Sequence, residues 1–208
     1  MRRLLLASVA ASLAACTTPG AVGERPKASA SELDKVTAVL KRDFHERGQA
    51  KMNRVELDEV QRLCNLNADN PPAEAAKRIE EAQLKTIKFP SGSLMGDWQR
   101  AEKVAQNGRG SMWSDKPGAP AGGSCYNCHQ ISPKETSFGT IGPSLLGFGK
   151  QRGNGPEMQK YVYGKIYNSK AYNACSTMPR LGYAGTLSEE QIKDLVALLL
   201  DPASPVNK

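Results

Sequence analysis

Hydrophobic residues recur at helical spacing through most of the chain, and no stretch of useful length alternates in the manner of a β-strand. Six segments show the helical spacing: residues 31–44, 55–66, 72–87, 96–108, 157–174 and 187–202. The last segment has the clearest ends, because Thr186 or Ser188 can cap it and Pro202 follows it. The pattern therefore predicts an all-α protein.

The first fifteen residues have the pattern of an export signal. Arg2 and Arg3 precede an apolar run that ends at Ala15, and this run is shorter than the roughly 20 residues that span a bilayer. The run leads into "LAAC", which resembles the lipobox of bacterial lipoproteins, so cleavage before Cys16 would leave this cysteine carrying lipid. The alternative is ordinary cleavage further along, after the triplet at 28–30.

Composition divides the remaining chain into three parts. Residues 16–30 are small and contain Pro and Gly, which favours a flexible tether. Residues 31–92 are predicted to form a helical extension that begins with Ser31 as its cap. Residues 93–208 are predicted to form the main domain, and no internal repeat is visible.

Charge and export narrow the classes of function. The net charge is +7, and loss of Arg2 and Arg3 with the signal lowers it to +5. This basicity suits an acidic partner or an anionic substrate, whereas the lack of a basic and aromatic patch argues against nucleic acid. Export predicts a periplasmic location, with membrane attachment if Cys16 is lipidated, and an oxidising setting for the other cysteines.

The stretch "SCYNCHQ" at 124–130 contains the strongest chemical signal. Its Cys-x-x-Cys-His spacing is the attachment signature of c-type haem. Two intervening residues place both thiols on one side of a helical turn, where they form thioethers with the two vinyl groups. Cys125 and Cys128 are therefore the predicted anchors of one covalent haem per chain, and His129 is the predicted proximal ligand of its iron.

Two other readings of the same motif are weaker. Zinc takes about four ligands, and no second pair exists because Cys64 and Cys175 stand alone and His45 is distant. A thioredoxin-type redox pair expects alternating strands and helices, which this chain lacks.

Met178 is the predicted distal ligand of the iron. It lies in an irregular loop before the last helix, and its thioether is a soft neutral ligand that raises a haem potential. His45 is the alternative ligand, on a helix face predicted to be solvated. Met158 fits an apolar helix face, while Met95 and Met112 precede the haem motif.

Two further contacts are predicted around these ligands. The carbonyl of Pro143 is placed to accept the second ring N–H of His129 and so to orient it, although a simple loop proline would look the same. A disulfide between Cys64 and Cys175 would pin the extension to the loop at 175–186 that contains Met178, called here the methionine loop. A free Cys175 thiol that competes for iron, or two unconnected buried cysteines, are the alternatives.

The order of these motifs resembles the class I cytochrome c family over residues 96–202. This resemblance implies a class I cytochrome c fold around one covalent haem, with residues 93–208 as the cytochrome domain. "CYNCHQ", "GTIGPSLLGFG" and "MPRLG" further resemble the SoxX family, the monohaem subunits of SoxAX complexes in sulfur-oxidising bacteria.

The SoxX resemblance implies a function and partners. The chain would form a heterodimer with the larger cytochrome SoxA, and the pair would couple thiosulfate to a cysteine of the SoxYZ carrier as an L-cysteine S-thiosulfotransferase. This chain would be the non-catalytic subunit that accepts the released electrons and passes them to a downstream acceptor. The alternative is a free-standing monohaem electron shuttle, and a peroxidase is disfavoured because Met178 would fill its sixth position.

Overall fold

The computed structural model describes residues 26–208, so the predicted signal peptide and Cys16 lie outside the described residues. The described chain is helical, and its single β-type pairing is the bridge between Arg47 and Ala50. Its α-helices are α1 (Ala30–Asp43), α2 (Glu59–Leu66), α3 (Ala73–Leu84), α4 (Trp98–Gln106), α5 (Phe148–Arg152), α6 (Pro156–Tyr167) and α7 (Glu189–Leu200). Short 3₁₀ helices are η1 (Met52–Val55), η2 (Cys125–Asn127), η3 (Ser169–Ala171) and η4 (Pro205–Asn207). No described helix is both long and apolar enough to cross a membrane.

Capping side chains fix where the helices begin. The predicted cap Ser31 is wrong, because Ser29 caps α1 and pairs with Glu32 in a capping box, so the helix starts at Ala30. Ser188 caps α7 as predicted, again in a reciprocal box that includes Gln191. These boxes satisfy backbone N–H groups that have no partner within the helix.

The helix predicted over 157–174 ends earlier, at Tyr167. The side chain of Asn168 accepts a hydrogen bond from Lys170 N at 3.2 Å and so begins η3. Its amide nitrogen donates to Gln83 Oε1 and to Thr86 Oγ1, both at 2.9 Å. Asn168 is fully buried, so tertiary hydrogen bonds to α3 and to the residue Thr86 just after it outweigh the local helical pattern.

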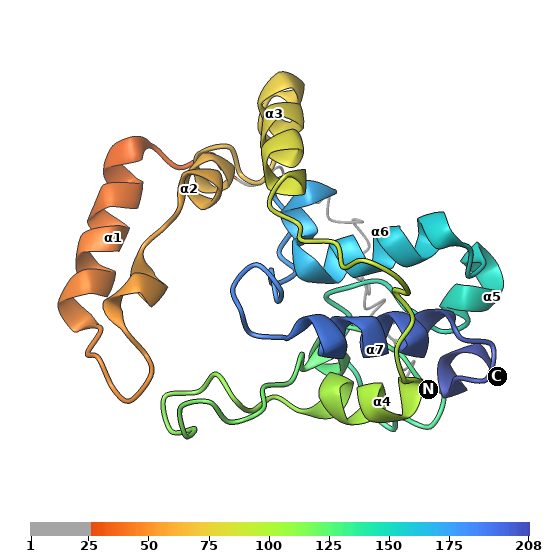
Figure 1. Cartoon of the computed structure of the whole chain (residues 1–208). Helices are drawn as coiled ribbons and strands as arrows, with labels where there is room; N and C mark the ends of the chain where they lie inside the picture. The colour runs from red at the N-terminus through yellow and green to blue at the C-terminus, as the bar shows by residue number, and fades with distance from the viewer. Residues whose placement is uncertain (1–25) are drawn as a thin grey trace, which may run out of the picture.

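The core lies where α4 and α6 pack against α7 (Figure 1). Hydrophobic residues of these helices with no more than 3% exposure form its centre: Ala101, Ala105, Val162, Tyr163, Ile192, Leu195, Val196, Ala197, Leu198 and Leu200. At the crossing of α4 and α7, buried Asp194 accepts hydrogen bonds from Arg100 at 2.9 and 2.8 Å and from Asp97 N at 2.7 Å. Gly96 permits this approach, because a Cβ there would lie 2.3 Å from Asp194 Oδ1.

The extension buries little apolar surface of its own. Figure 1 shows α1, η1 and α2 as an arm beside the helical core, and α3 stands above the core. Leu33 is the buried residue of α1, whereas Val36, Val39 and Leu40 on the same helix are exposed, and α3 has no buried residue. Hydrophobic burial alone therefore does not hold this arm in place.

The prediction of an all-α chain with an N-terminal helical extension agrees with the structure, but the narrower class I cytochrome c fold around one covalent haem is wrong. The described helices close on a core of their own side chains, against which Cys125 and Met178 themselves pack. One cavity lies beside Tyr126 and Asn127 and another beside Met178, and neither is lined by Cys125, Cys128 or His129. The order of motifs along a chain does not determine how its helices pack, so this structure supports only the broader class.

The α4–α7 crossing gives a test of the fold. Gly96→Ala would force a Cβ to within 2.6 Å of the backbone nitrogen of Asp194, so we expect a loss of about 1–3 kcal/mol in the free energy of unfolding. Urea denaturation followed by circular dichroism measures this loss. Gly155→Ala is the control, because nothing lies within 4 Å of its Cβ position, and equal stabilities of the two variants would contradict the close crossing.

Candidate functional site

The Cys-x-x-Cys-His segment folds as one tight turn. Ser124 adopts a left-handed conformation with φ 49°, and its hydroxyl accepts a hydrogen bond from Asn127 Nδ2 at 2.7 Å. The carbonyl of Cys125 then accepts from Cys128 N at 3.1 Å and from His129 N at 2.9 Å. The backbone of residues 124–129 thus forms one closed turn that contains both cysteines and the histidine.

Neither cysteine of this turn forms a disulfide. Burial raises the pKa of the Cys125 thiol to about 11, with the nearby Cys128 adding to the effect. Gly123 explains how tightly Cys125 is enclosed. A Cβ there would lie 2.9 Å from Cys125 Sγ and 3.6 Å from a methyl group of Leu181, so the turn lies directly beside the loop that follows Met178.

The imidazole of His129 is oriented from its Nδ1 side. Nδ1 lies 2.8 Å from the carbonyl oxygen of Pro143, the contact that the sequence predicted. Because a carbonyl can only accept, Nδ1 carries a proton, so the lone pair of the neutral ring lies on Nε2. Gly142 makes room for the ring, since a Cβ there would lie 2.1 Å from His129 Cε1. This tautomer is the one that a metal-ligating histidine needs.

Met178 is partly buried and its backbone is held. Its carbonyl accepts a hydrogen bond from the hydroxyl of Ser169 at 2.6 Å, and Ser169 is fully buried. Its amide nitrogen donates to Ser176 Oγ at 3.3 Å. The thioether side chain packs against the edge of the core.

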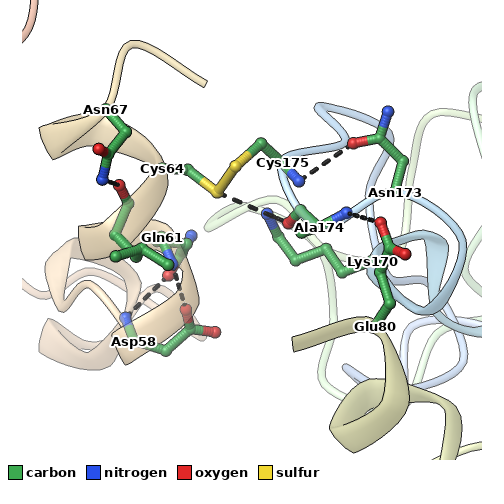
Figure 2. Close-up of a disulfide and its surroundings, with 10 residues drawn as sticks. Asp58, Gln61, Cys64, Asn67, Glu80, Lys170, Asn173, Ala174 and Cys175 are labelled. Atoms are coloured by element: carbon green, nitrogen blue, oxygen red, sulfur yellow. Dashed lines mark hydrogen bonds between the residues drawn. A yellow bond between two sulfur atoms is a disulfide. The ribbon is translucent and has the colours of Figure 1, made fainter. Parts of the chain in front are cut away.

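The predicted disulfide between Cys64 and Cys175 is present, with a Cα–Cα distance of 5.5 Å across 111 residues of sequence (Figure 2). The alternatives with a free Cys175 thiol or two unconnected cysteines are therefore wrong. The Asp69 carboxylate lies within 4.8 Å of both sulfurs, an arrangement that resembles a metal site. Because the sulfurs are bonded to each other, they offer no thiolate to a metal.

The backbone beside this disulfide is also fixed. Ala174 N donates to the carboxylate of Glu80 on α3 at 3.0 Å, and the ammonium of Lys170 donates to Ala174 O at 3.3 Å (Figure 2). Lys170 is only 8% exposed, and burial, followed by the charge of Arg180, lowers its pKa. The disulfide is thus part of a continuous polar contact between the extension and the methionine loop.

An ion pair that the sequence did not reveal lies at the other end of this loop. Arg180 donates to the carboxylate of Asp58, the residue that also caps α2 by accepting from Gln61 N at 2.7 Å. Burial acts to raise the pKa of Asp58, but the hydrogen bonds from Gln61 and Arg180 outweigh it and the pKa is lowered. The partners are 122 residues apart, so no local pattern could have paired them.

A cavity of about 540 Å³ lies between α2 and the methionine loop. Its walls include both disulfide cysteines, Lys170, Met178 and Arg180. A second cavity of about 340 Å³ lies beside the Cys-x-x-Cys-His turn at 124–129, called here the haem-type turn. Tyr126 and Asn127 of this turn line the cavity.

The remaining candidate ligands lie elsewhere. His45 is exposed in the segment after α1, and Met112 is also exposed. Met95 and Met158 pack against the core, as predicted for Met158.

These observations fit a covalently bound haem in their donor chemistry. The turn presents two cysteines without a disulfide, and the neutral ring of the neighbouring histidine has its lone pair on Nε2 because Nδ1–H donates a hydrogen bond to the Pro143 carbonyl.

Comparison with known proteins shows that the chain is similar to a bacterial lipoprotein. No protein-family profile matches the chain. The chain is 39% identical over 159 residues to an uncharacterized lipoprotein of Aquifex aeolicus (strain VF5), and this match covers 73% of each protein.

The orientation of His129 gives a test of the site. Gly142→Ala would push the ring away from the Pro143 carbonyl, so we expect the Nδ1 hydrogen bond to be lost. The ¹⁵N chemical shifts of the ring nitrogens report this loss, with His45 as an internal reference. Ile141→Ala in the same loop is the control because Ile141 is 77% exposed, and unchanged shifts in both variants would contradict the contact.

Proposed function

The chain belongs to the same family as the Aquifex aeolicus lipoprotein, and from this premise and the geometry of residues 125–129 we propose that it is an exported electron-transfer protein with one haem c. The observation that carries the proposal is the His129 Nδ1 contact with Pro143, beside two cysteines that form no disulfide. The proposal concerns the cofactor and its use and does not depend on the fold class.

Attachment of the haem requires only the two thiols. Cys125 and Cys128 would hold the group as thioethers, since addition of each S–H across one vinyl group would form the C–S bond without loss of any atom. Bound haem supplies a one-electron redox couple. The residues that would hold its iron are His129, through the Nε2 lone pair, and Met178, through a thioether on a backbone that Ser169 holds.

The specific process that we propose is thiosulfate oxidation in a SoxAX-type complex. What supports it is the resemblance of "CYNCHQ", "GTIGPSLLGFG" and "MPRLG" to SoxX sequences. In this proposal SoxA is the permanent partner, the SoxYZ carrier is transient, and this chain passes electrons to a downstream acceptor. One haem takes one electron at a time, whereas the coupling of thiosulfate to a cysteine releases two, so a second acceptor or two successive transfers complete each cycle.

The proposed location is the periplasm, with attachment to a membrane through lipid on Cys16. The relative is named a lipoprotein, and Cys16 of this chain follows a lipobox-like "LAA". From Cys16 to the start of α1 at Ala30 the chain reaches at most about 50 Å, which bounds the distance between the membrane and the extension.

Native mass spectrometry of the complex purified from its own cells tests the function. We expect one covalent haem on this chain and a one-to-one complex with a larger haem protein. The variant Cys125→Ala with Cys128→Ala should lose the covalent haem, because no thioether can form. A wild-type chain that carries haem but no partner would support the free electron shuttle instead, and a chain without covalent haem would reject the proposal.

Lipid attachment is tested separately with Cys16→Ser. We expect the wild-type chain to remain in the membrane fraction after a high-salt wash and the variant to be released in soluble form, because a lipid anchor resists salt whereas charge attraction does not. The intact mass of the wild-type chain should include the lipid. Equal release of both proteins would show that Cys16 does not anchor the chain.

A further inference from the structure

Helix α2 contacts the methionine loop at both of its ends. Near the C-terminal end of α2, Cys64 is bonded to Cys175, three residues before Met178. At its N-terminal end, the capping residue Asp58 is paired with Arg180, two residues after Met178. One short helix of the extension thus holds the chain on either side of the proposed iron ligand.

Both contacts are partly or fully removed from water. Cys64 is 4% exposed, and the side chains of Arg180 and Asp58 are 16% and 37% exposed. Arg180 also lies 4.7 Å from the ring centroid of Tyr183, in a cation–π contact. Such a pair is screened less than a surface ion pair, so it restrains the loop more than exposed pairs do.

The arm that carries this helix is also held at a distant point, by residues that precede η1. Gln49 Nε2 donates to Met112 O at 2.8 Å and to Gly110 O at 3.2 Å, which ties the arm to the loop before the haem-type turn. The guanidinium of Arg47 lies 3.4 Å from the ring centroid of Trp113. The arm is therefore attached to the rest of the protein at two separate places, so α2 does not simply follow the methionine loop when that loop moves.

We infer that α2 is a clamp that positions Met178, with Cys64 and Asp58 as the positioning residues. The inference rests on the proposed function, because it assigns the clamp to the iron-ligand loop. With both contacts intact, residues 175–180 are held at each end and Met178 departs rarely. When the clamp is broken, the loop opens more often and an external ligand replaces Met178 more quickly. This assigns a role to an extension that the haem motif does not explain.

The test uses the full-length haem-loaded protein in its ferric form. At saturating imidazole, the rate of ligand replacement reports how often Met178 leaves. We expect this rate to rise at least about tenfold in Cys64→Ser with Cys175→Ser, because the covalent link is lost, and about threefold in Asp58→Asn. Asn at position 58 can still cap α2, so that variant removes the charge and keeps the helix start.

Asp34→Asn is the matched control. Asp34 of α1 pairs with Arg62 of α2 at 3.0 Å and both side chains are exposed, so this ion pair joins two helices of the extension rather than α2 and the methionine loop. We expect this variant to exchange ligand at the wild-type rate. Replacement rates within twofold of wild type in all three variants would overturn the clamp.

Amide hydrogen exchange of residues 175–181 provides a second readout that needs no haem spectrum. Faster exchange in Asp58→Asn than in Asp34→Asn would support the clamp, and equal exchange would overturn it. If the double cysteine variant does not fold, Asp58→Asn decides alone. A wild-type chain without covalent haem would reject the proposed function, while its exchange rates would still decide whether α2 restrains the loop.

Discussion

The extension depends on the covalent bond between Cys64 and Cys175. Its helices bury few apolar residues, with three exposed hydrophobic side chains on α1 and no buried residue on α3, so burial alone does not hold them to the core. A bond across 111 residues restricts the unfolded chain, by about 4–5 kcal/mol in the chain-entropy description of disulfides. The polar contacts of Asp58, Glu80 and Gln49 then need only to orient an arm that is already tethered.

The same bond ties the arm to the loop that matters most for the proposed chemistry. Met178 is held by its own carbonyl through Ser169, and its flanks are held by α2. The other proposed ligand, His129, is oriented by its hydrogen bond to the carbonyl of Pro143. Both proposed ligands therefore take their position from backbone contacts to other segments, which is how proteins commonly orient the groups that bind a metal.

Local rules predicted much of this structure, and contacts between distant segments account for the rest. The caps at Ser188, the helical spacing of α7 and the haem-type turn follow from neighbouring residues. The short helix α5 was missed in a glycine-dense stretch, and Asn168 ended α6 early because its amide bonds to α3. The class I cytochrome c prediction went too far, since it inferred packing from motif order. Asp58 and Arg180 could not be paired from sequence, because nothing local marks either partner.

The pattern of disulfide formation bears on the cofactor as well. The four cysteines of the described residues could pair in several ways, but the structure joins Cys64 to Cys175 and leaves Cys125 and Cys128 without a disulfide. Burial raises the pKa of the Cys125 thiol to about 11, so the thiol form predominates near neutral pH. The thiolate is the species that attacks a disulfide, so burial slows the oxidation of this thiol in an oxidising compartment. The enclosure of Cys125 by Gly123 and Leu181 thus preserves the thiol that covalent attachment of haem would consume.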